Sequence, residues 1–247
     1  MTPRRLALVT GAGRNLGRAI ALALADAGLD VAVNVRGDVD AGERVAREVE
    51  QKGAASAVFP ADVASESSVS AMFDAIESTL GRTPDVLVNN ASIRPRQSLL
   101  AMTFDDWRRV QGVALDGAFL CTRAALPGMV ERGHGRIVNI IGRAAFTGHP
   151  EMAHVVAAKA GLHGLTRAIA LEFGPRGVTA NSVSPGPIRA DDGSLPGGLS
   201  ESQLLPTIPS RHVVSGADIA AVCVFLATDP GMITGQVIHA DGGQFIA

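Results

Sequence analysis

A glycine-rich segment near the N-terminus has the composition of a phosphate-binding loop. Residues 10–17 read TGAGRNLG and join a short apolar run to an amphipathic helical pattern. Glycine at a strand-to-helix turn lets the backbone approach a pyrophosphate, and the free N–H groups of the helix N-terminus attract its negative charge. Because the segment follows the first expected strand and opens the first expected helix, it predicts a dinucleotide-binding loop rather than an ordinary tight turn.

Two arginines lie where the ribose of such a dinucleotide is expected. The second expected strand ends with residues 34–37, NVRG, which lack the acidic residue that would bind both ribose hydroxyls of NAD. Guanidinium groups at Arg14 and Arg36 suit a 2′-phosphate instead. We therefore expect NADP(H) rather than NAD(H), with solvated surface arginines as the alternative.

Apolar runs alternate with helical patterns along the whole chain. Strands are expected at Leu6–Thr10, Val31–Val35, Ala55–Pro60, Val86–Asn89, Arg136–Ile141, Thr179–Ser184 and Gln236–Ala240. Helices are expected at Leu16–Ala27, Ala41–Lys52, Glu66–Leu80, Phe104–Arg132, Met152–Phe173 and Gly216–Thr228. This alternation predicts an α/β fold, a Rossmann-type doubly wound parallel sheet in a single domain over residues 1–247.

One irregular stretch interrupts this pattern. Residues 186–211 are rich in proline and glycine, and we expect them to form a flexible flap over the carboxyl ends of the strands, where ligands bind.

Composition narrows the class of protein. The 247 residues carry a formal net charge of −2 without long runs of one sign, which argues against nucleic-acid and membrane partners. No apolar stretch is expected to approach the roughly 18 residues that span a bilayer. The two cysteines lie in apolar helical contexts and fit buried thiols in a cytoplasmic protein. The six histidines show no metal-binding spacing, so no metal is expected.

Further motifs make the chain similar to one family over nearly its whole length. They are Asp62-Val63, residues 89–92 (NNAS), residues 185–188 (PGPI), residues 233–236 (ITGQ) and residues 241–243 (DGG). Together with the glycine loop, they resemble the short-chain dehydrogenase/reductase family, and within it the 3-oxoacyl-acyl carrier protein reductases. The resemblance implies dinucleotide contacts at Gly11, Arg14, Asn15, Leu16, Gly17, Arg36, Asp62, Val63, Asn89, Ala91, Lys159, Pro185, Gly186 and Ile188.

The phosphate loop departs from the family at one position. Asn15 stands where the middle glycine is usual. Asparagine tolerates left-handed backbone conformations better than most residues, so we expect binding to be weakened or reshaped rather than lost.

The family's chemistry uses four side chains. A tyrosine exchanges the proton on the substrate oxygen, and a lysine four residues later lowers its pKa and binds the nicotinamide ribose. A serine donates a hydrogen bond to the same oxygen, and an asparagine supports a water chain to the lysine. These roles follow from hydride transfer, because the substrate oxygen gains negative charge and must be stabilised and protonated.

Three of these four positions hold residues that cannot exchange a proton. The segment AAKAG at residues 157–161 matches the family's lysine with Lys159, which puts the tyrosine position at Val155. The serine and asparagine positions fall on Gly142 and Ala114, and the threonine near the carboxamide falls on Ala190. No shift in alignment supplies a tyrosine, because the chain contains none.

Other polar residues near these positions are candidates to replace them. His154 is a candidate acid or base, although a regular helix rotates it by about 100° from the face of Val155 and Lys159. Arg94, Arg143 and Arg189 could make the cleft cationic and suited to a small anionic substrate. Surface or subunit contacts are the alternative roles for His154 and for the arginines, and Lys159 could serve only to bind ribose.

Three hypotheses remain open at this point. The preferred one is an enzyme of atypical, even non-redox, mechanism on a small carbonyl or anionic metabolite. The second is a dinucleotide-binding pseudoenzyme, and the third is an NADPH-dependent oxidoreductase with a substitute proton donor. A cofactor that binds without reacting, or no cofactor, also remains an alternative. The two long helices, 104–132 and 152–173, are expected to form a homo-oligomer, a tetramer or a dimer.

Overall fold

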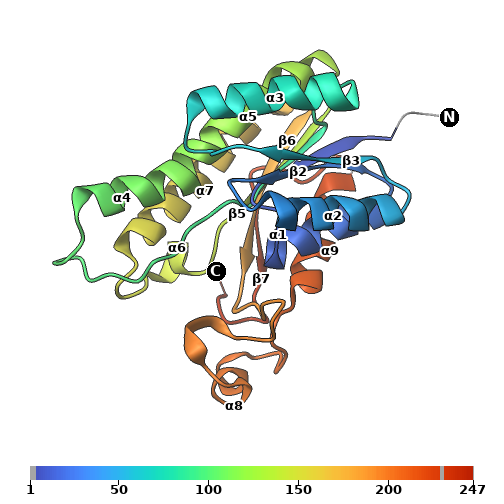
Figure 1. Cartoon of the computed structure of the whole chain (residues 1–247). Helices are drawn as coiled ribbons and strands as arrows, with labels where there is room; N and C mark the ends of the chain where they lie inside the picture. The colour runs from blue at the N-terminus through green and yellow to red at the C-terminus, as the bar shows by residue number, and fades with distance from the viewer. Residues whose placement is uncertain (1–3, 229–230, 247) are drawn as a thin grey trace.

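A computed structural model describes residues 4–228 and 231–246, and its centre is a seven-stranded parallel sheet (Figure 1). The strand order is β3-β2-β1-β4-β5-β6-β7, so the chain reverses direction of winding between β1 and β4. The strands are β1 (Leu6–Val9), β2 (Asp30–Val35), β3 (Ser56–Pro60), β4 (Val86–Asn89), β5 (Gly135–Ile140), β6 (Val178–Pro185) and β7 (Val237–Ala240). The expected doubly wound sheet is confirmed, with strand ends within two residues of those expected.

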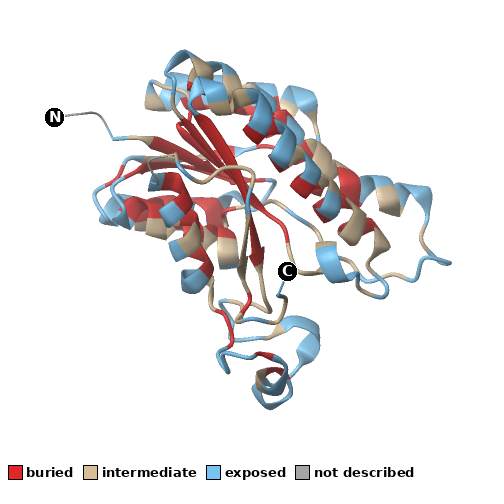
Figure 2. Ribbon diagram, turned by 180° about the vertical axis from the view of Figure 1, so that it is seen from behind, coloured by how far each residue is buried: buried red, intermediate tan, exposed pale blue. Residues whose placement is uncertain are grey.

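Helices cover both faces of the sheet (Figure 1). One face carries α1 (Asn15–Asp26), α2 (Val39–Gln51) and α9 (Gly216–Thr228), and the other carries α3 (Glu66–Leu80), α5 (Gly117–Glu131) and α7 (Ala153–Phe173). The side chains of strand β1 pack against the helices on both faces of the sheet. Ala7 and Val9 pack in the first layer, whereas Leu6 and Leu8 pack in the second. Successive side chains of a strand point to opposite faces, so these continuously apolar strands are buried on both sides (Figure 2).

The expected helix Phe104–Arg132 is not a single regular helix. It consists of α4 (Phe104–Gln111), a π-helical segment η1 (Gly112–Asp116) and α5. A π-helical segment inserts one residue into the 3.6-residue repeat, and apolar periodicity does not reveal such an insertion. The segment carries Ala114, one of the residues singled out above, toward α7.

The same stretch corrects the expectation about apolar length. Phe104–Glu131 has 28 residues and a mean hydropathy of 1.3 in its best window, which is sufficient in length and composition to span a membrane. Half of that window is buried inside the fold. Ala125 and Met129 of α5 pack in the core with α3 and the sheet, so its apolar composition is that of a core helix.

The segment after β6 contains short helical turns as well as loops. They are η3 (Pro196–Gly198), α8 (Glu201–Leu204) and η4 (Leu205–Thr207), and they lie below the sheet in Figure 1. Leu204, Ile208 and Val213 form a small apolar cluster of their own. The flap therefore has a local core, which its proline and glycine content did not predict. A further short helix, α6 (Ala144–Thr147), follows β5.

A line of buried polar side chains connects three strands to two helices. Asn89 of β4 donates hydrogen bonds to Asn139 Oδ1 of β5 (2.8 Å) and to Thr122 of α5 (3.2 Å). Asn139 Nδ2 donates to Thr166 of α7 (2.9 Å), and the Thr166 hydroxyl pairs with Ser182 of β6 (2.9 Å). Buried amides that lose a partner are costly, so this line fixes α7 against the sheet.

Replacing Thr166 tests how much this line contributes. Thr166→Val keeps the shape of the side chain but leaves the buried Asn139 amide without its acceptor. We expect the free energy of unfolding in denaturant to fall by about 1–3 kcal/mol. Thr228→Val is the matched control, because both hydroxyls donate to the carbonyl four residues earlier but Thr228 is exposed. Equal losses in the two variants would contradict a special role for the line.

Candidate functional site

A cavity of about 710 Å³ opens at the carboxyl ends of the strands. Its walls come from the loop between β1 and α1, the loop between β2 and α2, the residues after β4, and the start of the flap after β6. It extends from Arg36 at one end to Lys159 at the other. It therefore lies at the reversal in strand order, the position where open α/β sheets bind ligands.

The glycine loop has the close packing that a phosphate-binding turn needs. Gly11 has a φ of +62°, a conformation that side chains disfavour. A Cβ on Gly17 would overlap the Gly11 carbonyl oxygen and the Asn90 side chain. Asn90 Nδ2 donates to the carbonyl oxygens of Thr10 and Gly11 (2.9 and 3.1 Å), which holds the loop against the residues that follow β4. These residues fit the diphosphate of a dinucleotide, because glycines without a Cβ let the loop backbone approach it closely.

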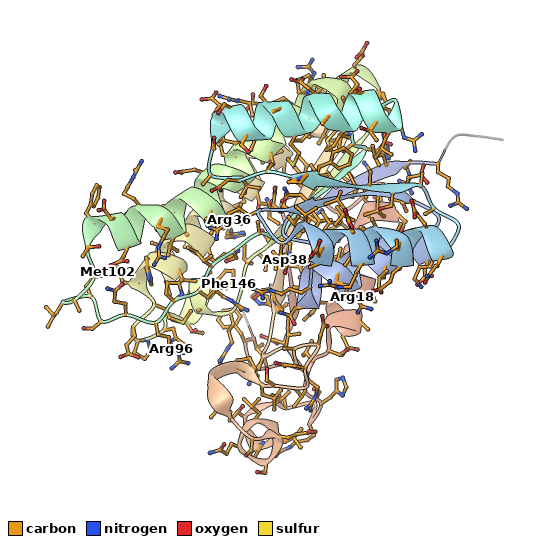
Figure 3. All side chains as sticks on the ribbon, viewed as in Figure 1. Arg18, Arg36, Asp38, Arg96, Met102 and Phe146 are labelled. Atoms are coloured by element: carbon orange, nitrogen blue, oxygen red, sulfur yellow. The ribbon has the colours of Figure 1, made fainter. Side chains whose placement is uncertain are left out.

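Charged residues line the cavity at the end where Arg36 lies. Arg14, Arg36, Asp38 and Asp62 all line it. Figure 3 labels Arg36 and Asp38 near the centre of the molecule, on the loop between β2 and α2, with Arg96 well away from them. Asp38 Oδ1 accepts the Ala41 N–H (3.0 Å) and so caps α2. An acidic residue is thus present two positions beyond Arg36, but one of its oxygens is already engaged.

Lys159 is the titratable group at the inner end of the cavity. Its Nζ donates to the Ile140 carbonyl oxygen (2.6 Å), and the residue is only 5% exposed. Among the described residues, none forms a salt bridge with it. Burial and, as the smaller effect, the positive charge of Arg94 together lower the pKa of Lys159 from 10.5 to about 7. Charged and neutral forms of this amine therefore coexist near neutral pH.

Most residues expected to contact a dinucleotide line this one cavity. They are Gly11, Arg14, Asn15, Leu16, Gly17, Arg36, Asp62, Val63, Ala91, Lys159, Pro185 and Ile188. The other two, Asn89 and Gly186, do not line it. The Asn89 side chain belongs to the buried polar line described above. Gly186 packs closely against Asp241, and a Cβ there would contact the Asp241 backbone. Both residues therefore lie behind the cavity wall.

The positions matched to tyrosine and asparagine pack against each other. Val155 and Ala114 form one apolar cluster with Val110 and Ala158, and Val155 is 3% exposed. None of these residues lines the cavity. Gly142, at the serine position, has open space where a Cβ would be.

The proposed replacement residues are divided between the cavity and its surroundings. Arg94 and Arg189 line the cavity, whereas Arg143 and His154 do not. His154 is fully buried, and both of its ring nitrogens lack a hydrogen-bond partner in the described structure. Its backbone oxygen accepts from Gln111 Nε2 (2.8 Å), which joins α4 to α7. The helix rotates His154 away from Lys159, as its geometry predicts.

Sequence reasoning missed several residues that shape the site. Asn34 Oδ1 accepts the Gly11 N–H (3.2 Å), and the Thr10 hydroxyl accepts the N–H groups of Asn90 and Ala91 (both 3.0 Å). Asp38 was missed because the acidic residue was sought at the strand tip. Asn34 and Thr10 could have been found from the sequence, since asparagine and threonine at the ends of buried strands must satisfy their polar groups locally.

The chain resembles known reductases over its whole length. The family model described as enoyl-(acyl carrier protein) reductase matches residues 11–244. The 3-oxoacyl-[acyl-carrier-protein] reductase of Staphylococcus aureus (strain Mu50) is 40% identical over 247 residues, covering 100% of both chains. The corresponding reductase of Synechocystis is 40% identical over 97% of this chain and 96% of its own length.

A solved structure gives the same result. A protein of Sinorhizobium meliloti 1021, provisionally described as a short-chain alcohol dehydrogenase, superposes with a TM-score of 0.91 at 34% identity. The match covers 97% of this chain and 96% of that one.

The buried amine predicts how stability depends on pH. The pKa of Lys159 is about 7 in the folded protein, whereas the ordinary value of 10.5 applies once the chain unfolds. Between these values the unfolded chain binds the extra proton, so the free energy of unfolding should increase as pH rises from about 7 to 10.5. We expect Lys159→Met to remove this increase in denaturant titrations at several pH values. Parallel pH curves for the two proteins would contradict the lowered pKa.

Proposed function

Because the chain belongs to the short-chain dehydrogenase/reductase family, we propose that it is a nicotinamide-dinucleotide-dependent oxidoreductase in which Lys159 replaces tyrosine as the proton donor. The observation that carries the proposal is the Lys159 Nζ at the inner end of a dinucleotide-sized cavity, without an acidic partner among the described residues. A bound nicotinamide dinucleotide supplies or accepts the hydride.

The glycine loop would hold the diphosphate of this cofactor. The loop and the first residues of α1 line the cavity, and Gly11 and Gly17 allow the close approach that a diphosphate requires. Arg14 and Arg36 would bind a 2′-phosphate, which favours NADP(H). Asp38 is less suited to the ribose hydroxyls of NAD, because one of its oxygens caps α2.

Lys159 would act on the substrate oxygen. When hydride reaches a carbonyl carbon, the oxygen takes up negative charge and needs a proton. The Lys159 ammonium can donate that proton near neutral pH because its pKa is about 7. The Ile140 carbonyl oxygen holds Nζ in place while the proton leaves. In the reverse direction, the neutral amine accepts the proton from an alcohol.

Arg94 supports an anionic substrate. It lines the cavity close enough to Lys159 for its charge to affect the amine, and the described structure gives it no ion pair. Arg189 also lines the cavity, but it is paired with Glu201 (2.6 Å). We therefore assign recognition of a substrate carboxylate or phosphate to Arg94 rather than Arg189.

A second candidate function is dinucleotide binding without turnover. The specific observation in its favour is the apolar cluster of Val155 and Ala114, which fills the tyrosine and asparagine positions with tightly packed side chains. A protein of this kind would sense the cofactor or stabilise a partner subunit. Its fold and glycine loop would be retained for binding alone.

Replacing Arg36 tests the cofactor preference. We expect NADP to raise the melting temperature of the wild type more than NAD does, because Arg36 pairs with the 2′-phosphate. Arg36→Gln should weaken NADP(H) binding by about tenfold, a loss that corresponds to one charge-assisted contact of about 1.4 kcal/mol, and leave NAD(H) binding nearly unchanged. Arg47→Gln, on the exposed surface of α2, is the control. Equal effects of Arg36→Gln on both dinucleotides would contradict the preference for NADP.

Two substitutions of Lys159 test its role as the proton donor. Lys159→Arg keeps the positive charge but cannot release a proton near neutral pH. We expect it to bind NADPH within a few-fold of the wild type and to lose about 10²-fold or more of kcat. Lys159→Met should lose the same activity, and wild-type carbonyl reduction should slow as pH rises through the pKa of the donor. The measurement is NADPH absorbance over a panel of 2- and 3-oxo acids and their esters.

A restored variant provides the positive control for that panel. Val155→Tyr, Gly142→Ser and Ala114→Asn together rebuild the missing groups, and Gly142 has open space for a side chain. Full activity of Lys159→Arg would show that another group donates the proton. Activity confined to the restored variant would favour the second candidate function.

A further inference from the structure

The flap contacts the phosphate loop through two reciprocal hydrogen bonds. The Asn15 backbone N–H donates to Asp191 Oδ2 (2.7 Å), and the Asp191 backbone N–H donates to Asn15 Oδ1 (3.1 Å). Asn15 lines the cavity from the α1 side, and Arg189 and Ala190 line it from the flap side. The pair therefore connects two opposite walls of the cavity, 176 residues apart in sequence.

The asparagine at position 15 makes the second of these bonds possible. Asn15 has a φ of +49°, in the left-handed region where glycine is the usual residue. A glycine here would keep the backbone bond to Asp191 Oδ2 but would lose the side-chain acceptor for the Asp191 N–H. The residue at this position thus adds a contact with the flap and keeps the conformation that the loop needs.

Contacts within the flap hold Asp191 in place. A tight turn surrounds it, with Ala190 N–H donating to Ser194 O and Gly193 N–H donating to Ala190 O (both 2.9 Å). Arg189 anchors the start of the turn through its N–H to Val214 O (3.1 Å) and its ion pair with Glu201 (2.6 Å). The Asp191 carboxylate is therefore presented to the loop by a structured segment.

We propose that the Asp191 carboxylate is an internal anion that competes with the diphosphate of the dinucleotide for the phosphate loop. This inference rests on the proposed dinucleotide site. A carboxylate and a phosphate accept from the same kind of N–H group at a helix N-terminus, and two anions at one position repel each other. Entry of the diphosphate then breaks both hydrogen bonds and displaces the flap, so cofactor affinity and flap position are coupled.

Binding measurements on three variants test the competition. Asp191→Ala should bind NADPH and inorganic pyrophosphate about 3- to 10-fold more tightly than the wild type, because loss of one carboxylate contact at a helix N-terminus has effects of that order. Asn15→Gly should tighten binding by a smaller factor. Asp192→Ala is the matched control, since it removes the same charge one residue later, where the carboxylate accepts the Ser194 N–H within the turn. It should bind like the wild type.

A readout without dinucleotide separates this inference from the proposed function. Trypsin cleavage after Arg189 or Arg211, followed by mass spectrometry of the ligand-free proteins, should be faster in Asp191→Ala than in Asp192→Ala. Equal cleavage rates, or NADPH binding to Asp191→Ala that is unchanged or weaker, would overturn the competition. If no dinucleotide binds the wild type or any variant, the proposed function fails, whereas faster cleavage of Asp191→Ala still supports the closed flap.

Discussion

The hydrogen-bonded line through Asn89, Asn139 and Thr166 is the constraint on which the site depends. It ties β4 and β5 to α7 beside a large cluster of buried apolar side chains. Buried amides tolerate few alternative arrangements, because each lost partner is costly. The line therefore fixes the helix that carries Lys159, two turns before Thr166, and brings its Nζ to the end of β5 at Ile140.

The position of that amine accounts for its lowered pKa. Lys159 is buried beside the cationic Arg94, without a carboxylate partner in the described structure. The positions that the resemblance matches to the family's tyrosine and asparagine hold Val155 and Ala114, which lie in one apolar cluster. The proposed role of Lys159 as proton donor rests on its lowered pKa, because an amine that titrates near neutral pH can itself move a proton.

The sequence predicted the fold well, and the site only in part. Helices α3 and α9 and strand β4 have the expected bounds, because buried apolar runs and clear caps define them. The π-helical segment was missed, since one inserted residue does not disturb apolar periodicity. His154, expected as a candidate acid or base, is instead buried outside the cavity, because the helix rotates it away from the face of Lys159. The hydrogen bonds between Asn15 and Asp191 could not be predicted from the sequence, because they join residues that only the folded sheet brings together.

Titration of the Lys159 amine would show whether this residue can exchange a proton near neutral pH. The chain has only two lysines, so ¹⁵N-lysine labelling gives two side-chain signals, with Lys52, paired with Asp26 at the surface, as the reference. Lys159→Arg identifies the signal of Lys159 by its loss. We expect this signal to titrate with a pKa of about 7 and to respond to NADPH. A Lys159 signal that still carries its proton at pH 10, with or without NADPH, would contradict it.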